Sequence, residues 1–254
     1  KFNNDMLRLY AVTDRHWTGE KTLYEQVRDV LMGGATCLQL REKDLDEASF
    51  YEEAKNIKEL CRLFDVPFII NDNVMLAKEI DADGVHVGQD DMACVKAREI
   101  LGPDKIIGVS AHTIEEARIA KEQGADYLGV GAIFPTSSKD DAEVLGIERL
   151  KEMTDTVDLP MVAIGGISYD NCLLLKDTGI DGIAVISALF GQKNIKQATI
   201  DLKKRVDALY ETMHTCLTIA GRGLFLSEQA LFVLLYGGVC LHKLPRHSFN
   251  AGQK

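Results

Sequence analysis

Apolar runs and amphipathic segments alternate along the chain as far as Met213, and this alternation predicts most of the architecture. Short apolar runs of the kind that form buried strands cover Leu7–Val12, Thr36–Leu40, Phe68–Ile70, Gly84–Val87, Ile106–Val109, Tyr127–Val130, Met161–Ile164 and Gly182–Ile186. Segments with apolar residues at helical spacing lie between them: one from Thr22 to Gly33, then Asp46–Phe64, Val74–Ile80, Met92–Leu101, Thr113–Gln123, Ile147–Met153, Asp170–Asp177 and Ile195–Met213.

Eight strands that alternate with eight helical segments favour a closed parallel (β/α)8 barrel, the TIM barrel. The competing architecture is a doubly wound open sheet, which rarely needs eight units of such even length. We therefore predict one barrel domain over residues 1–214.

Residues 215–254 do not continue the pattern. Their apolar run, Ala230–Leu241, is short and is interrupted by Gly237-Gly238. We expect an atypical C-terminal tail of unknown role, either disordered or packed loosely on the barrel. A helix that touches a membrane is the less favoured alternative.

Composition narrows the class of partner. The formal net charge of −10 argues against a general nucleic-acid or anionic-membrane surface, so an anionic substrate would need a local cluster of Lys and Arg. The six cysteines are scattered without metal-binding spacing, which fits a reducing cytoplasm. No signal peptide and no apolar run of roughly 18 residues is seen. The first residue is Lys1, from which we expect a trimmed N-terminus. Small-molecule substrates are predicted, and a homo-oligomer is left open.

Two strands end in carboxylates. Phe68–Ile70 runs into Asn71-Asp72, and Gly84–Val87 runs into Gly88-Gln89-Asp90-Asp91. Ligands of parallel α/β proteins sit at the carboxyl ends of the strands, and Mg²⁺ takes one or two protein carboxylates together with water and phosphate. The alternative is a pair of solvated turn or helix-capping aspartates.

Cations and hydroxyls follow other strands. Gln39 and Arg41 share one face of the second strand, so Gln39-Leu40-Arg41-Glu42-Lys43 would place two cations at the mouth, unless Arg and Glu form a structural pair at the rim. His86 is a candidate for substrate contact or for supporting a residue that makes one. The Ser110 hydroxyl would either donate to phosphate or cap the next helix.

The stretch Gly131–Gly146 is irregular and contains Pro135-Thr136-Ser137-Ser138-Lys139. Three hydroxyls and a lysine can surround an anion, and a loop of this length in a compact barrel is typical of a lid. A solvated linker is the alternative. Gly165-Gly166 after the seventh strand, together with Ile186-Ser187 after the eighth, predicts the backbone phosphate site common in barrels. One anion site therefore suits a pyrophosphate and the other a monophosphate.

In combination, these motifs resemble the thiamine phosphate synthase family from about Leu7 to about Met213. They are Gln39-Leu40-Arg41-Glu42-Lys43, Asn71-Asp72, His86-Val87-Gly88-Gln89-Asp90-Asp91, Gly108-Val109-Ser110-Ala111-His112-Thr113, Pro135-Thr136-Ser137-Ser138-Lys139 and Gly165-Gly166-Ile167. Ser138 stands where the family often has Thr, which keeps a hydroxyl, and the tail has no counterpart.

The resemblance implies a role for each of these positions. The pyrimidine diphosphate would be held by Gln39, Arg41, Lys43, Asn71, Ser110 and Lys139, and Mg²⁺ by Asp72 and Asp91. The thiazole phosphate would be held by Thr136, Ser138, Gly166, Ile186 and Ser187, while Leu40, Glu42 and Ser137 complete the predicted substrate-binding set. Arg41, Lys43, Ser110 and Lys139 are the predicted catalytic residues.

The reaction that the resemblance implies is transfer of an alkyl (non-methyl) group. Diphosphate leaves the methylene carbon of 4-amino-2-methyl-5-pyrimidinylmethyl diphosphate, and the nitrogen of 4-methyl-5-(2-phosphoethyl)thiazole attacks the resulting cation. Two alternatives are a paralogue that isomerises a thiazole carboxylate phosphate and a non-catalytic protein that binds thiamine intermediates.

Overall fold

The structure, a computed structural model, describes residues 2–89, 92–136 and 144–210. Residues as far as Leu209 form one compact unit. The predicted tail, along with Asp91, Ser137, Ser138 and Lys139, lies outside the described residues. The domain boundary near residue 214 therefore stays a prediction.

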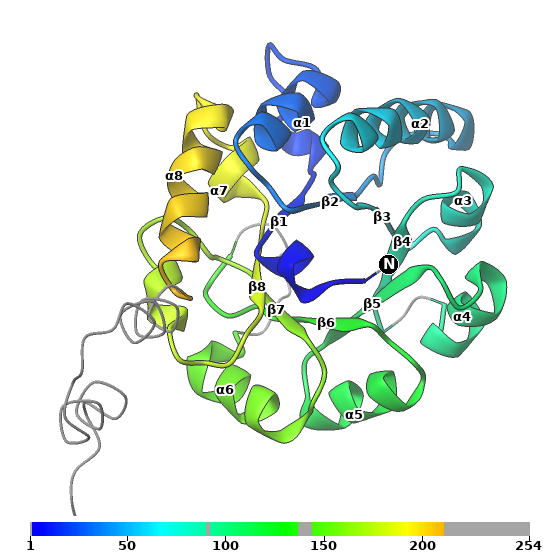
Figure 1. The fold of residues 1–254 in the computed structure, drawn as a ribbon. Coiled ribbons are helices and arrows are strands. Elements are labelled where there is room, and N and C mark those ends of the chain that lie inside the picture. Colours follow the sequence, from blue (N-terminus) through cyan, green and yellow to red (C-terminus); the bar gives the residue numbers. More distant parts are fainter. Residues whose placement is uncertain (1, 90–91, 137–143, 211–254) are drawn as a thin grey trace, which may run out of the picture. The chain divides into compact units, whose positions relative to one another are not determined.

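Eight parallel strands close into a barrel (Figure 1). They are β1 (Leu9–Val12), β2 (Cys37–Leu40), β3 (Phe68–Asn71), β4 (Gly84–Val87), β5 (Ile106–Ala111), β6 (Tyr127–Val130), β7 (Met161–Ile164) and β8 (Gly182–Val185). Each strand pairs with the next, and β8 pairs with β1 through Tyr10 and Ala184. The predicted TIM barrel is confirmed, since every strand continues into a helical segment on the outside.

The helices form the outer ring seen in Figure 1. They are α1 (Leu23–Met32), α2 (Glu47–Leu63), α3 (Val74–Glu79), α4 (Cys94–Leu101), α5 (Ile114–Glu122), α6 (Gly146–Thr156), α7 (Ser187–Phe190) and α8 (Ile195–Asp207). Polar caps fix several starts. Thr22 and Glu25 form a reciprocal capping box on α1, and the Asp46 carboxylate accepts from the Ser49 N–H at the start of α2.

Two expectations about local structure were wrong. The segment predicted as a helix over Asp170–Asp177 is a single 3₁₀ turn, η3 (Cys172–Leu175), because Cys172 and Leu175 are its buried residues and a 3₁₀ turn places residues three apart on one side. Leu7 does not begin β1. It belongs instead to the 3₁₀ turn η1 (Asn4–Leu7), and a third 3₁₀ turn, η2 (Arg15–Trp17), follows β1.

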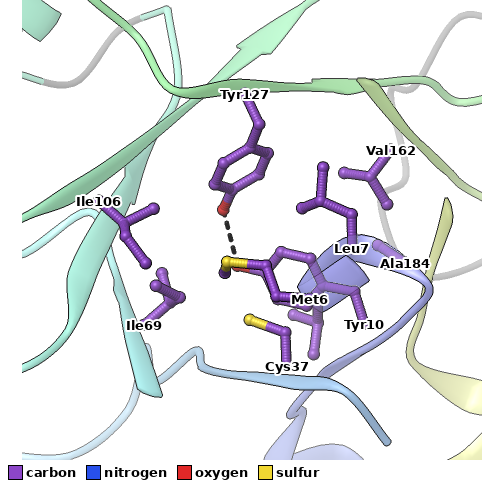
Figure 2. Packing of buried hydrophobic residues seen from close by; sticks show 10 residues of the cluster. Met6, Leu7, Tyr10, Cys37, Ile69, Ile106, Tyr127, Val162 and Ala184 are labelled. Carbon is purple, nitrogen blue, oxygen red and sulfur yellow. Dashed lines mark hydrogen bonds between the residues drawn. The ribbon is translucent and has the colours of Figure 1, made fainter. Parts of the chain in front are cut away.

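Side chains fill the barrel interior (Figure 2). Met6 and Leu7 of η1 join inward-facing residues of the strands in one cluster, and that cluster also contains Tyr10, Val12, Cys37, Ile69, Ile106, Tyr127, Val162 and Ala184. Alternation along β2 then places Gln39 on the same inward face as Cys37. The core is therefore not wholly apolar, because two phenols and an amide lie within it.

The described part of the chain bears on two more expectations. Its four cysteines, Cys37, Cys61, Cys94 and Cys172, are buried and free, as expected of small core residues. No helix within these ranges is both long and apolar enough to cross a membrane.

Candidate functional site

The predicted site residues that the structure describes lie at the carboxyl ends of the strands, on one face of the barrel. Gln39, Arg41 and Lys43 follow or end β2, Asn71 and Asp72 end or follow β3, Ser110 lies near the end of β5, Thr136 follows β6, Gly166 follows β7, and Ile186 and Ser187 follow β8. Because all eight strands are parallel, these ends converge on a single mouth.

The end of β1 fixes the backbone of Arg41. The Thr13 side chain, which is fully buried, accepts from the Arg41 N–H at 2.9 Å and donates to the Arg41 carbonyl at 3.2 Å. Arg41 Nη1 lies 3.4 Å from Asp14 Oδ2. Sequence reasoning did not find this support, because Thr13 and Asp14 lie far from Arg41 along the chain. The signal available was the polar Thr13-Asp14-Arg15 run directly after a predicted strand.

Glu42 organises the loop that carries Lys43. Its side chain is 1% exposed, and its Oε2 lies 2.7 Å from Arg15 Nη2. The other oxygen accepts from the N–H groups of Lys43 and Asp44 at 2.9 and 3.0 Å. Burial alone would raise the pKa of Glu42, but Arg15 and these N–H groups outweigh it and hold the pKa below its ordinary value.

These contacts refine the prediction for the second-strand motif. The rim does contain an Arg–Glu pair, but the arginine is Arg15, which also binds Glu53, whereas Arg41 faces Asp14. A contribution of Glu42 through loop geometry is what its contacts support. Leu40 is fully buried on the face of β2 opposite Gln39, so only its backbone is suited to reach a ligand.

Asp72 is an exposed carboxylate in a constrained turn. Its φ of 62° lies in the left-handed region, where Asp is one of the tolerated residues, and its N–H donates to the His86 carbonyl at 2.8 Å. Asn71 Nδ2 donates to Asp72 Oδ1 at 2.5 Å. The cap of α3 is Asn73, whose side chain accepts from the Leu76 N–H, so helix capping does not account for Asp72.

The donor set is compatible with a magnesium ion. An exposed carboxylate at the mouth, oriented by a neighbouring amide, is the hard oxygen ligand that Mg²⁺ takes. Among the described residues no three His, Cys, Asp or Glu side chains gather as a fuller metal site. The second predicted ligand, Asp91, is not among them.

Ser110 is held from within the barrel. Its Oγ lies 2.9 Å from His86 Nε2, and its carbonyl accepts from Gln89 Nε2 at 2.6 Å. Thr113, not Ser110, caps α5. The helix-cap interpretation of Ser110 is therefore wrong, since its hydroxyl contacts His86 instead.

His86 continues into a buried chain of polar groups. Its Nδ1 lies 3.0 Å from the Tyr127 hydroxyl. That hydroxyl lies 2.7 Å from the Tyr10 hydroxyl, the bond dashed in Figure 2. Gln39 Nε2 donates to the Tyr10 oxygen at 2.9 Å. Burial raises the pKa of both phenols well above the ordinary tyrosine value, so both stay protonated. The two tyrosines were missed from the sequence, where they read only as strand residues.

The glycine turn after β7 packs against the loop after β6. Gly166 has a φ of 64°, and a Cβ there would lie 2.4 Å from the Pro135 carbonyl oxygen. Only glycine suits this backbone and this approach. Thr136, the next residue after Pro135, is thereby kept beside the turn, and Asn171 Nδ2 holds the turn by donating to the Gly166 carbonyl at 2.8 Å.

The neighbouring strand β8 ends in the short helix α7. The N–H groups of Leu189 and Phe190 donate to the Ile186 carbonyl, so those of Ser187 and Ala188 precede the first bond inside the turn. Strands β7 and β8 pair through Ile164 and Ala184, which brings their two loops out side by side. Thr136, Gly166, Ile186 and Ser187 thus come from adjacent loops.

Fold and site together define a (β/α)8 barrel whose predicted site residues, as far as the structure describes them, lie at the carboxyl-end mouth, where barrel enzymes carry their active sites. The chain belongs to the thiamine monophosphate synthase family, because the model of that family matches residues 9–189.

Individual relatives agree with the family assignment. Over 189 residues the chain is 49% identical to the thiamine-phosphate synthase of Clostridium acetobutylicum, covering 74% of this chain and 90% of that protein. It is 48% identical over 206 residues to the thiamine-phosphate synthase of Methanobrevibacter smithii, covering 81% and 98%. Among solved structures, thiamine phosphate pyrophosphorylase from Pyrococcus furiosus matches with a TM-score of 0.76 and 43% identity, covering 82% of this chain and 98% of that one.

Proposed function

We propose that this chain is a thiamine phosphate synthase that joins 4-amino-2-methyl-5-pyrimidinylmethyl diphosphate to 4-methyl-5-(2-phosphoethyl)thiazole. One observation carries the proposal: the family match over residues 9–189 spans every described site residue, and all of these lie at one mouth. The products are thiamine phosphate and pyrophosphate.

In the bond-breaking step, the carbon–oxygen bond between the pyrimidine methylene and the diphosphate cleaves. The bonding electron pair leaves with the diphosphate, and the electron-rich aminopyrimidine stabilises the cation that remains. The thiazole nitrogen then donates its lone pair to the methylene carbon. No protein nucleophile takes part, so the protein supplies position and charge.

The cations stabilise the departing diphosphate. Arg41 and Lys43 after β2, together with Lys139, are placed by the proposal around its oxygens. Gln39, Asn71 and Ser110 complete the pyrimidine side with hydrogen bonds. Asp72 and Asp91 would hold Mg²⁺, which neutralises charge on the diphosphate when bound. The Thr13, Asp14 and Glu42 contacts support this assignment, because they fix the loop that carries both described cations.

The monophosphate of the thiazole occupies the second part of the mouth. Thr136, Ser138, Gly166, Ile186 and Ser187 bind it through hydroxyl and backbone N–H groups. The close approach of Gly166 to Pro135 supports this grouping, since it keeps the turn after β7 against the loop after β6. The free buried cysteines support placing the enzyme in a reducing cytoplasm.

A coupling assay tests the function. Purified chain is incubated with both substrates in Mg²⁺ or in EDTA, and thiamine phosphate and pyrophosphate are quantified in the same sample. We expect equal amounts of both products with Mg²⁺, none when either substrate is omitted, and a strong loss in EDTA. Absence of both products from a folded, Mg²⁺-supplied sample would refute the proposal.

A further inference from the structure

Five polar side chains from five strands form one continuous chain through the barrel. It runs from Gln39 on β2 through Tyr10, Tyr127 and His86 to Ser110 on β5, with distances of 2.9, 2.7, 3.0 and 2.9 Å between successive partners. Gln39 is 6% exposed, His86 9%, and the tyrosines at most 1%. Ser110, at the mouth end, is the one member of the five that is partly exposed.

The barrel makes room for this chain with two glycines. A Cβ on Gly108 would lie 2.1 Å from Cζ of Tyr127, and one on Gly129 would lie 3.0 Å from Cε1 of His86. Both glycines pair with members of the chain, Gly108 with Tyr127 and His86 and Gly129 with Ser110. The two rings therefore fill space that neighbouring strands leave open for them.

The direction of the chain follows from its first donor. The Gln39 amide nitrogen can only donate, so the Tyr10 oxygen accepts from it and must send its own proton elsewhere. Tyr127 is the strong acceptor beside it, whereas the nearby Cys37 thiol is a weak one. Tyr127 then has one proton left to donate, and its remaining partner is His86 Nδ1.

We propose that His86 is a positioning residue, held by this chain as the neutral tautomer with its proton on Nε2, and that it donates this proton to Ser110 Oγ. The Ser110 hydroxyl proton is then directed into the mouth. Ser110 acts as a donor to an acceptor atom of the bound ligand, a phosphate oxygen or a ring nitrogen, and not as an acceptor from an amine.

The donation from Ser110 to a ligand rests on the proposed function, because Ser110 contacts substrate only if the mouth is the active site. The tautomer itself does not depend on activity. It is set by buried protein groups and can be measured in the ligand-free chain.

Nitrogen-15 NMR of the full-length chain tests the tautomer. Long-range proton–nitrogen correlations report which ring nitrogen is protonated, and the His86 signals are identified by their absence from the His86→Asn variant. We expect a protonated Nε2 and an unprotonated Nδ1 for His86. A proton on Nδ1, or on both nitrogens, would overturn the proposal.

Two variants test whether the hydrogen-bonded chain of side chains sets the His86 tautomer. Gln39→Glu replaces the donor at its start with a group of the same shape that accepts, so the chain should reverse and move the His86 proton to Nδ1. Tyr127→Phe removes the donor to Nδ1, so the two tautomers should mix. Circular dichroism establishes that each variant is folded. An unchanged His86 tautomer in both folded variants would contradict the claim that the hydrogen bonds from Gln39 to His86 set the tautomer.

The coupling assay separates the two levels of the proposal. If the tautomer is as expected but the wild-type chain forms no thiamine phosphate, the proposed function fails and the positioning of Ser110 stands. If the wild-type protein is active but the His86 tautomer is reversed, only the positioning proposal fails.

Discussion

At the scale of single residues, the site depends on partners that are distant along the chain. Tyr10 and Tyr127 share a hydrogen bond across 117 residues of sequence, and Thr13, which follows β1, holds the Arg41 backbone. Local sequence patterns carry no information on such pairs, which exist only because the barrel closes. The prediction from sequence therefore named the residues suited to contact substrate and His86 as a possible support, but it missed Tyr10, Tyr127 and Thr13.

Glu42 gives a pH-dependent prediction at this scale. Its folded pKa is lowered, so the stabilisation from its contacts is fully present above the ordinary glutamate pKa of about 4.3 and is lost as the pH falls through the lowered value. Glu42→Gln removes the charge, and we expect its melting temperature near pH 7 to fall by several degrees, at about 2–4 °C per kcal/mol.

Thermal unfolding between pH 7 and pH 3 is the measurement. The difference between wild type and Glu42→Gln should shrink as the pH falls below about 4.3. Glu79→Gln is the matched control, because Glu79 is exposed on α3. A difference that stays constant over the whole range would contradict the assigned partnership with Arg15.

At the scale of elements, the described start of the loop after β6 packs against the glycine turn after β7. Gly166 permits this through a left-handed backbone and a close approach to Pro135. Gly166→Ala should push the two loops apart and raise the KM for the thiazole phosphate by roughly 10-fold or more, because small misplacements of binding groups are costly. The KM for the pyrimidine diphosphate should change much less.

A second glycine provides the control for Gly166. Gly124 also has a positive φ, +84°, but a Cβ there meets nothing within 4 Å, and it lies between α5 and β6, away from the mouth. Gly124→Ala therefore imposes similar backbone strain without moving the loops. Steady-state kinetics of both variants are the measurement. Equal KM values for the thiazole phosphate in Gly166→Ala and Gly124→Ala would contradict the proposal that the loops after β6 and β7 bind this phosphate together.

Elements were predictable from sequence to different degrees. The strands were, because each is a short apolar run between turn residues, and buried parallel strands have no other signature. The turn η3 was not, since Cys172 and Leu175 fit a helical spacing as well as a 3₁₀ one. Leu7 was assigned to β1 because burial beneath the barrel and burial within a strand select the same apolar residue.

At the scale of the whole molecule, a net charge of −10 is combined with a mouth assigned to anionic substrates. The cations that follow β2 resolve this contrast locally, since Thr13 holds the backbone of Arg41 and the Glu42 carboxylate holds the backbone of Lys43. Long-range attraction of substrates is therefore not expected to be the main source of binding. We expect contacts at fixed positions within the mouth to be the main source of binding.

Asp72 provides the most direct test of the claim that this mouth performs the coupling reaction. Turnover is compared between the wild-type chain, Asp72→Asn and the control Asp104→Asn, whose carboxylate is exposed in the loop between α4 and β5 at the opposite end of the barrel. We predict a loss of roughly 10²-fold or more for Asp72→Asn, with a similar loss for Lys139→Ala, and little change for Asp104→Asn. Wild-type turnover in both Asp72→Asn and Lys139→Ala would contradict the account.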